Sequence, residues 1–236
     1  LEKDSPAELA SRVNDLLLPI VKGLGSERAW VLLGTESLQT FGGSGFLQEY
    51  PLEQYVRDAK IDTLYEGTTA IQGLDFFFRK IVKDHGQSMT GLSMQIAQFA
   101  KDLGAQAGYF DTEREALGKA LDNVQGIVNV MASAALQSDP RMGGDLKNLY
   151  KVGQNTSRLL LCSGDVVIGW LLLRQAEVAQ AALAKGGLSA SETSFYQGKV
   201  AAARFFARNV LPKLAGEVAV AQLIDNSLME IPEAAF

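Results

Sequence analysis

Glu66 is an acidic residue whose position in the sequence allows a catalytic or a structural interpretation. It stands between Tyr65 and Gly67, just before a helix that we expect to begin at about Thr68. A carboxylate there faces unpaired backbone N–H groups, so one interpretation is a helix N-terminal acid that complements the helix dipole. The other is a general base on a tight turn beside a cavity, where a bound apolar substrate would raise its pKa by desolvation. Position alone leaves both interpretations open.

A glycine-rich run, Gly42-Gly43-Ser44-Gly45, precedes this residue in the chain. Glycine lets the backbone turn sharply or approach a ligand closely, so the run predicts either a helix C-cap with a turn or a ligand contact. It is not a dinucleotide-binding fingerprint, because Gln48 stands where the third glycine would lie and no strand precedes the run.

Composition excludes several other kinds of chemistry in these 236 residues. The single histidine, His85, excludes a zinc site built on a pair of histidines. The single cysteine, Cys162, excludes an intrachain disulfide and a multi-thiolate metal site. We therefore expect no metal. The net charge of −5 provides no basic field for nucleic acid or for an anionic membrane.

The elements that must position these residues are helices, because no alternation typical of a strand persists anywhere in the chain. In the first part we expect four helices, the first of them kinked or shortened at Pro19. They cover about residues 5–22, 26–40 and 52–62, and then from about 68 to a C-cap at Gly86.

The second part is richer in alanine and more regular. Its expected helices cover about residues 88–107, 112–137, 145–185 and 191–228, the last bent at Pro212. Glu113-Arg114-Glu115 is typical of a solvated helix start. The longest apolar run, Leu159 to Leu173, is shorter than the roughly 20 residues of a membrane span, so we expect no transmembrane segment. The fold prediction is all-α: a helical domain over residues 1–86 followed by a second bundle of long helices over residues 87–236.

Four motifs in the first part occur in the order and spacing of a known family. They are Gln39 with the glycine run and Phe46, then Glu49-Tyr50-Pro51, then Arg57-Asp58-Ala59-Lys60-Ile61, then Tyr65-Glu66-Gly67-Thr68 with Ile71-Gln72. Over about residues 5–85 the chain resembles the C-terminal helical domain of the acyl-CoA dehydrogenase family. The remaining residues are similar, less specifically, to the additional helical domain of large members, such as the very-long-chain type and the larger bacterial enzymes.

The resemblance implies an enzymatic function. The family uses FAD to oxidise an acyl-CoA thioester to a trans-2-enoyl-CoA in fatty acid β-oxidation. Glu66 matches the base that removes the pro-R α-proton while the β-hydrogen leaves as hydride to the flavin N5. Its backbone N–H would donate to the thioester carbonyl. Substrate contacts are therefore expected at Glu66 and Gly67.

The resemblance also implies contacts with the cofactor. Gln39 and Gly43 match positions that touch the FAD pyrophosphate of the neighbouring subunit, which implies a homodimer. Thr68 matches a position that contacts the adenosine diphosphate part of FAD. Ala70 departs from the family, which usually has Gln or Glu there, so that nucleotide contact is absent or replaced.

Further partners follow from the same resemblance. The family's preceding domains carry most of the flavin and CoA pocket, so we expect activity to need the missing N-terminal part of the same protein. Electrons would pass to an electron-transfer flavoprotein, and the expected location is the cytoplasm. Two alternatives stay open: a dehydrogenase for a short sulfur-containing acyl-CoA, and a non-catalytic helical module for oligomerisation or docking.

Overall fold

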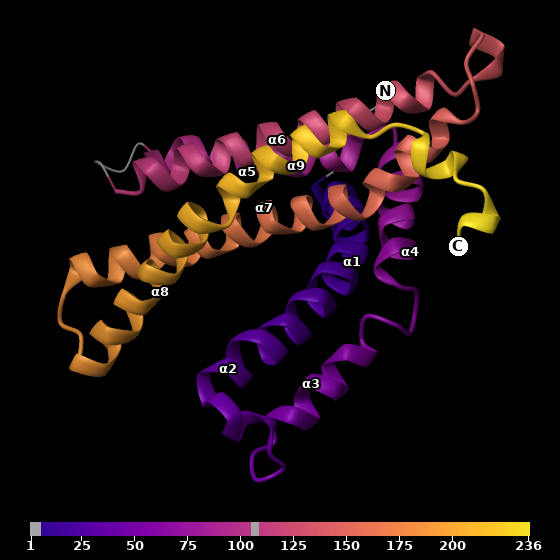
Figure 1. Cartoon of the computed structure of the whole chain (residues 1–236). Coiled ribbons are helices and arrows are strands. Elements are labelled where there is room, and N and C mark those ends of the chain that lie inside the picture. The colour runs from indigo at the N-terminus through magenta and orange to yellow at the C-terminus, as the bar shows by residue number, and fades with distance from the viewer. Residues whose placement is uncertain (1–5, 105–108) are drawn as a thin grey trace. The chain divides into compact units, whose positions relative to one another are not determined.

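The computed structural model describes residues 6–104 and 109–236 (Figure 1). Within these ranges every regular element is a helix, and the prediction of an all-α fold is confirmed. The α-helices are α1 (Pro6–Val31), α2 (Leu38–Phe41), α3 (Leu52–Ile61), α4 (Thr69–Leu74), α5 (Gln87–Gly104), α6 (Asp111–Leu136), α7 (Asn148–Lys185), α8 (Ala190–Asn209) and α9 (Leu214–Leu223).

The chain divides into two compact units. The first comprises residues 1–89 together with Thr156–Leu161 of α7, and the second comprises residues 90–155 and 162–236. The sequence predicts a boundary between two domains at residues 86 and 87. A domain is a part of the chain that folds by itself, and the division into compact units does not test this, so the boundary stays a prediction.

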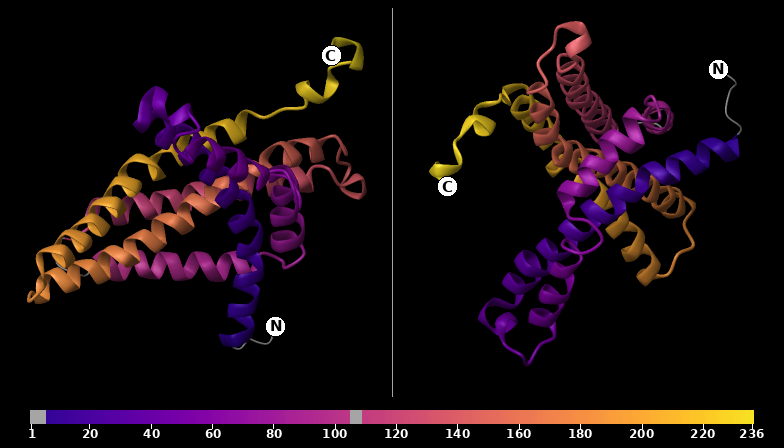
Figure 2. Two further views of the ribbon diagram at one scale, coloured as in Figure 1. Left: turned by 90° about the horizontal axis from the view of Figure 1, so that it is seen from below. Right: turned by 90° about the vertical axis from the view of Figure 1, so that its right-hand side faces the viewer.

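In the first unit, α1 is a single helix where the sequence predicts separate helices over 5–22 and 26–40 (Figure 2). The helix continues through Pro19, so of the two predicted effects the shortening is wrong, while the kink stays a prediction. An interior proline costs about 3 kcal/mol. Fully burying a leucine or isoleucine gains about 1.5–3 kcal/mol, so burial around the proline outweighs its cost. The buried side chains on this stretch are Leu16, Ile20 and Leu24.

The rest of the first unit follows the predicted order. A π-helical turn, Leu32–Ser37, leads into α2, which ends at the glycine run. The expected helix over 52–62 is confirmed as α3, and the helix expected from about Thr68 begins as α4 and continues through a π-helical turn, Asp75–Val82. Gly86 then adopts a φ of +73°, as a helix-terminating glycine does.

Two glycines let residues 156–161 of α7 pack directly against first-unit helices. A Cβ at Gly23 of α1 would lie 2.6 Å from Leu160 Cδ2. A Cβ at Gly73 of α4 would lie 2.8 Å from the backbone nitrogen of Ser157. Gly73 therefore requires a residue without a side chain, because backbone cannot give way, whereas a side chain at Gly23 would force the Leu160 side chain to move.

In the second unit, α5, α6 and α7 begin within a few residues of their predicted starts. The expected helix over 88–107 runs partly outside the described residues. The expected helix over 191–228 is divided into α8 and α9 by a 3-10 turn at Leu211–Lys213, which contains Pro212. The prediction that it reaches residue 228 is wrong.

The early end of α9 has a local cause. The Asp225 carboxylate accepts hydrogen bonds from the Ser227 backbone N–H at 2.9 Å and from its hydroxyl at 2.6 Å. A side chain that bonds the backbone in this way competes with the helical ladder. Beyond Leu223 the chain is therefore extended at Ile224 rather than helical.

The second unit has an apolar core and one strongly desolvated acid. Glu113 of α6 has a side chain only 2% exposed, and it accepts hydrogen bonds from Arg208 of α8, with its carboxylate oxygen 2.7 Å from Nε and 2.6 Å from a terminal guanidinium nitrogen. The expectation of a solvated helix start at Glu113 is wrong, because α8 covers this face of α6. The core side chains around α6 and α7 include Leu117, Val124, Ile127, Met131, Leu173 and Ala176.

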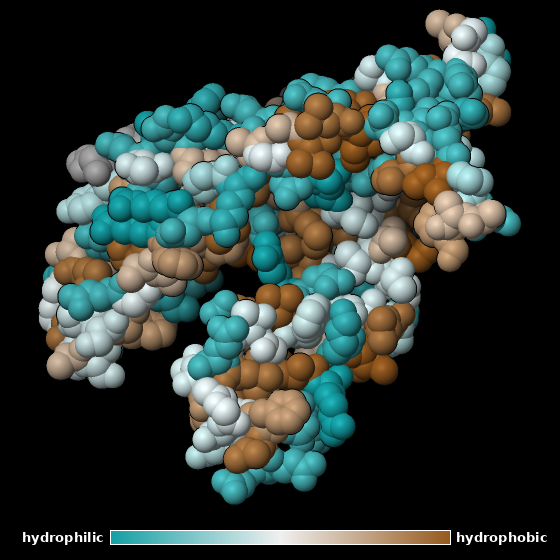
Figure 3. Space-filling view, viewed as in Figure 1, coloured by the Kyte–Doolittle hydropathy of each residue, from teal (hydrophilic) through white to brown (hydrophobic). Residues whose placement is uncertain are grey.

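Part of the second unit's surface is apolar. Figure 3 shows apolar side chains gathered on the visible face of α9. There Val220 is 44% and Leu223 is 81% exposed.

Candidate active site

Glu66 lies on a tight turn between α3 and α4. Its φ is +56° and that of Gly67 is +90°, so two successive residues adopt the left-handed conformation that only glycine enters readily. Thr68 is the N-cap of α4, as the sequence predicts, and the Glu66 side chain is exposed. The backbone of this turn is thus held in a conformation that glutamate does not prefer.

Two side chains from different parts of the chain hold this turn. The Lys22 ammonium of α1 donates to the Gly67 carbonyl oxygen at 2.6 Å. The Gln72 amide of α4 donates to the Glu66 carbonyl oxygen at 3.1 Å. The carbonyl oxygens of both left-handed residues are therefore fixed by side chains.

The first turn of α4 is tied to α1 through Glu27. Its carboxylate accepts from the Thr69 hydroxyl at 2.6 Å and from the Trp30 indole N–H at 2.9 Å. Lys60 of α3 lies over the Trp30 ring, 4.3 Å from its centroid. Partial burial pushes the pKa of Glu27 upward, but the two hydrogen bonds and the charges of Lys60 and Lys22 outweigh it, so the pKa lies below its usual value.

Tyr65, beside Glu66, is also held. Its hydroxyl donates to the Asp62 carboxylate at 2.9 Å. This hydrogen bond, the Asp62 charge and more weakly the Glu66 charge raise the pKa of Tyr65 above its usual value, because each favours the protonated phenol. The phenol therefore stays neutral at physiological pH and serves as a donor.

The glycine run lies at the other end of α3 from Glu66. It follows α2 and precedes α3, a helix of ten residues that spans about 15 Å at 1.5 Å per residue. Gly42 is the C-cap of α2 with a φ of +59°, so the C-cap interpretation of the run is confirmed. A Cβ at Gly43 would meet nothing within 4 Å, whereas one at Gly45 would lie 2.9 Å from the Leu38 carbonyl oxygen.

The structure thus places the predicted cofactor-binding residues in two groups. Gln39 and Gly43 are exposed at one end of α3, and Thr68 is exposed beside Glu66 at the other. Ala70 is exposed on α4. Whether these residues bind FAD is not tested by their placement, and their roles stay proposals.

Three residues of this site were not found from the sequence: Lys22, Glu27 and Gln72. Lys22 and Glu27 stand in an unremarkable helical stretch, and their partners lie 45 and 42 residues further along the chain. Gln72 belongs to the last of the four motifs, but the motif does not reveal that the Gln72 amide donates to the Glu66 carbonyl oxygen.

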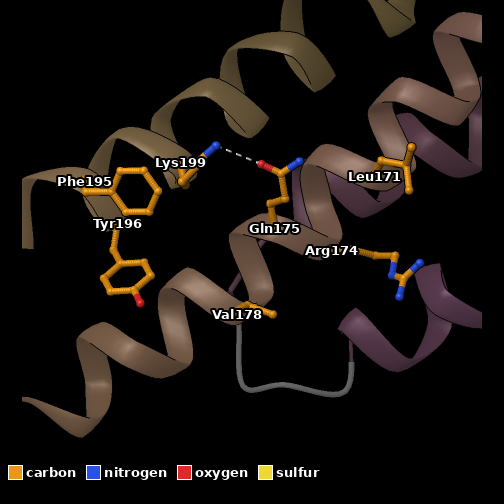
Figure 4. A pocket seen from close by; sticks show the side chains of 7 residues that line it. All are labelled: Leu171, Arg174, Gln175, Val178, Phe195, Tyr196 and Lys199. Carbon is orange, nitrogen blue, oxygen red and sulfur yellow. Dashed lines mark hydrogen bonds between the residues drawn. The ribbon is translucent and has the colours of Figure 1, made fainter. Parts of the chain in front are cut away.

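The cavity shown in Figure 4 belongs to the second unit and lies between α7 and α8. Its volume is about 440 Å³, and Lys199 donates to Gln175 across it at 3.1 Å. Its lining contains no carboxylate that could act as a base. The lining residues are Leu171, Arg174, Gln175, Val178, Phe195, Tyr196 and Lys199.

Two other residues singled out from the sequence lie away from Glu66 in the chain. Cys162 is buried, and His85 lies in the turn between the π-helical turn and α5, with a φ of +52°. Among the described residues, no three His, Cys, Asp or Glu side chains are grouped so that they could hold a metal ion.

Among the described helices, α7 is long and apolar enough to cross a membrane, with a mean hydropathy of 1.5 over an 18-residue window. In the structure, 56% of that window is buried. A buried core helix of a soluble protein passes the same test, so this is weak evidence for a span.

Two family models match the chain. The acyl-CoA dehydrogenase C-terminal domain matches residues 12–76, which include Gln39, Gly43, Glu66 and Thr68. The family described as acetyl-CoA dehydrogenase C-terminal like matches residues 92–232, more than half of the chain. The chain belongs to the acyl-CoA dehydrogenase family.

Three similar curated proteins are bacterial dehydrogenases. The broad-specificity linear acyl-CoA dehydrogenase FadE5 of Mycobacterium tuberculosis is 55% identical over 98% of this chain, which is 36% of its own length. A butyryl-CoA dehydrogenase of Syntrophomonas wolfei is 31% identical over 92% of this chain and 33% of its own. The 3-methylmercaptopropionyl-CoA dehydrogenase of Ruegeria pomeroyi is 33% identical over 88% of this chain and 33% of its own.

This chain therefore spans about a third of the length of the curated relatives it matches. The activities in their names belong to proteins about three times as long.

Proposed function

We propose that this chain is the base-carrying C-terminal part of an FAD-dependent acyl-CoA dehydrogenase that oxidises acyl-CoA thioesters to trans-2-enoyl-CoA in β-oxidation. The observation that carries the proposal is the Glu66 turn. Glu66 has a left-handed backbone, next to a glycine of φ +90° and before a helix, and the backbone carbonyls of these two residues accept one long-range and one local side-chain hydrogen bond. Such backbone strain persists only where the surrounding structure fixes it, as it does at many active sites.

The chemistry asked of Glu66 is removal of a weakly acidic α-proton. A carboxylate does this as a general base once a bound acyl chain excludes water and raises its proton affinity. The backbone N–H of Glu66 would donate to the thioester carbonyl oxygen, where negative charge develops as the proton leaves. Gly67, with no side chain, leaves that carbonyl access to the turn. When bound, FAD supplies the acceptor for the β-hydride.

Three exposed positions fit the polar part of FAD. Gln39 carries an amide donor, and Thr68 carries a hydroxyl. A Cβ at Gly43 would have no neighbour within 4 Å, so a phosphate oxygen has room to approach that backbone. We propose that Gln39 and Gly43 hold the pyrophosphate of the FAD of the neighbouring subunit in a homodimer. Thr68 would contact the adenosine diphosphate part.

The proposed enzyme needs partners. The walls of the acyl and flavin pocket opposite Glu66 would come from the N-terminal part of the same protein, and the exposed Glu66 side chain would face them. Electrons would leave to an electron-transfer flavoprotein, and the cytoplasm is the proposed location. Because the relative at 55% identity is named a broad-specificity linear acyl-CoA dehydrogenase, linear acyl-CoA thioesters are the first candidate substrates. The relative named for a sulfur-containing acyl-CoA, at 33% identity, makes such a thioester the second candidate.

The deciding experiment replaces Glu66 by Gln in the full-length protein. General base catalysis contributes about 10²–10⁴ in rate, so dehydrogenation of acyl-CoA with an artificial electron acceptor is expected to fall by at least about 10². Bound flavin, measured by its visible absorbance, is expected to remain. The matched control is Glu53→Gln, which removes a half-buried carboxylate of α3 that pairs with Arg57 at 3.5 Å.

Two results would contradict the proposal. One is a Glu66→Gln variant as active as the wild type. The other is a wild-type protein that purifies without flavin and takes none up, which would favour a non-catalytic helical module.

A further inference from the structure

The Glu66 turn has a backbone conformation that glutamate disfavours, so other groups must hold it in place. Left-handed φ values at a non-glycine residue are retained only if neighbouring groups over-determine them. The Gln72 amide is a local tie, six residues from the Glu66 carbonyl that it bonds. The Lys22 ammonium is a long-range tie, which connects Gly67 to α1 across 45 residues of sequence.

Lys22 is itself firmly placed. Its neighbours Gly23 and Leu24 are both buried, and Gly23 packs against Leu160 so closely that a Cβ there would lie 2.6 Å from that side chain. The backbone of α1 at this point therefore has little freedom to move. The Lys22 ammonium also lies 6.0 Å from the centroid of the Tyr65 ring. Tyr65 precedes Glu66 in the chain and Gly67 follows it, so Lys22 is near both neighbours of Glu66.

The hydrogen bond from Lys22 is short and has a charged donor. A charged donor gives shorter and stronger hydrogen bonds than a neutral one, and its 2.6 Å length agrees with this. By contrast, the Gln72 bond is neutral and 3.1 Å long. The Lys22 bond is thus the stronger of the two side-chain hydrogen bonds to the carbonyl oxygens of the turn.

We propose that Lys22 is a positioning residue for proton abstraction: its ammonium holds the Gly67 carbonyl and so keeps the Glu66 carboxylate and backbone N–H aligned on the thioester. This inference rests on the proposed function. Misplacing a catalytic group by about 1 Å can lower a rate by about 10²-fold. The loss expected here is smaller, because the Gln72 bond remains.

The test uses the full-length protein with Lys22→Met, which keeps the apolar stem and removes the donor. The rate of dehydrogenation, kcat, is expected to fall about 10-fold with KM changed less than about 2-fold, since the effect is on geometry at the reacting atoms. Exchange of the α-proton of a saturated acyl-CoA with D₂O, measured by mass spectrometry, is expected to fall by the same factor. Lys22→Arg, which restores a charged donor, is expected to recover most of both rates.

Lys80→Met is the matched control. Lys80 also makes a bond of 2.6 Å in the first unit, to Asp15, but it does not touch the turn. If Lys22→Met lowers kcat and α-proton exchange no more than Lys80→Met does, Lys22 has only a structural role and the inference is overturned. The same holds if Lys22→Arg recovers neither rate although it restores the melting temperature.

The two proposals fail in different ways. If Glu66→Gln abolishes both dehydrogenation and α-proton exchange but Lys22→Met leaves both unchanged, the inference about Lys22 fails and the proposed function stands. If Glu66→Gln leaves both rates unchanged, the proposed function fails, and the role of Lys22 fails with it.

Discussion

In the first unit Gly73 of α4 lies against the backbone of residues 156–157, whereas in the second unit Gly126 of α6 lies against a side chain of α9. A Cβ added to Gly73 of α4 would lie 2.8 Å from backbone atoms of Thr156 and Ser157. Between α6 and α9, a Cβ added to Gly126 would meet only the Val218 side chain, at 3.4 Å. The first contact allows no adjustment, because backbone atoms cannot change rotamer, while the second is ordinary packing.

The polar groups differ in the same way. In the first unit, Lys22, Glu27 and Gln72 bond to groups within the segment Glu66–Thr69. In the second unit, the buried Glu113 pairs with Arg208 and serves to join two helices. The polar contacts of the first unit thus fix the position of one turn, while the Glu113–Arg208 pair of the second unit fixes the packing of two long helices.

Adding a methyl group to one glycine of each unit tests this difference between the units. Gly73→Ala is expected to destabilise the protein by about 2 kcal/mol, because the new Cβ meets backbone and forces α4 away from residues 156–161. This happens even though alanine favours a helix by about 1 kcal/mol over glycine. Chemical denaturation followed by circular dichroism measures the change. Unchanged stability would show that α4 and α7 can separate freely.

The opposite effect is expected at Gly198 of α8, an exposed glycine whose added Cβ would meet nothing within 4 Å. Gly198→Ala is expected to stabilise the protein by about 0.5–1 kcal/mol, since alanine loses less backbone entropy in a helix interior. The same denaturation experiment tests it. A loss of stability would mean that this face of α8 is covered in the full-length protein.

The smallest effect is expected from the charge of Glu27, which is half-buried and screened by water. Its pKa is lowered in the folded state, so its charge adds stability above the unfolded value of about 4.5, and this is lost as the pH falls through the folded pKa. Glu27→Gln keeps a hydrogen-bond acceptor for Thr69 but removes the charge. The difference in melting temperature between wild type and variant should therefore shrink between neutral pH and about pH 3. A constant difference would show that the charge makes no contribution.

Much of the fold was predictable because helical periodicity is a local property. The ends of α3, α6 and the C-terminus of α7 agree with the sequence to within a residue or two, since capping residues, glycines and apolar spacing act over a few positions. The errors arose where packing overrode local preference. Pro19 does not end α1, because burial on both sides of it gains more than the proline costs.

The candidate site divides in a similar way. Glu66, Gly67 and Thr68 are contiguous, and the motif locates them together with Gln39 and Gly43. Lys22 and Glu27 belong to no motif, and the sequence gives no sign that they meet Gly67 and Thr69. Glu113 was expected to be solvated because a helix start is usually exposed, but α8 buries it.

The sequence by itself determined that the chain is helical and where most helices begin and end, because these follow from interactions among residues close together in the chain, which repeat with the period of the helix. The proposal of Glu66 as a base rests instead on the resemblance of its motif to the acyl-CoA dehydrogenase family. Only the tertiary structure decided that Glu66 lies on a left-handed turn, that a lysine 45 residues upstream of Gly67 holds this turn, and that two glycines admit residues 156–161 of α7 beside α1 and α4. Those contacts join distant segments, and a contact between distant segments exists only once the chain has packed.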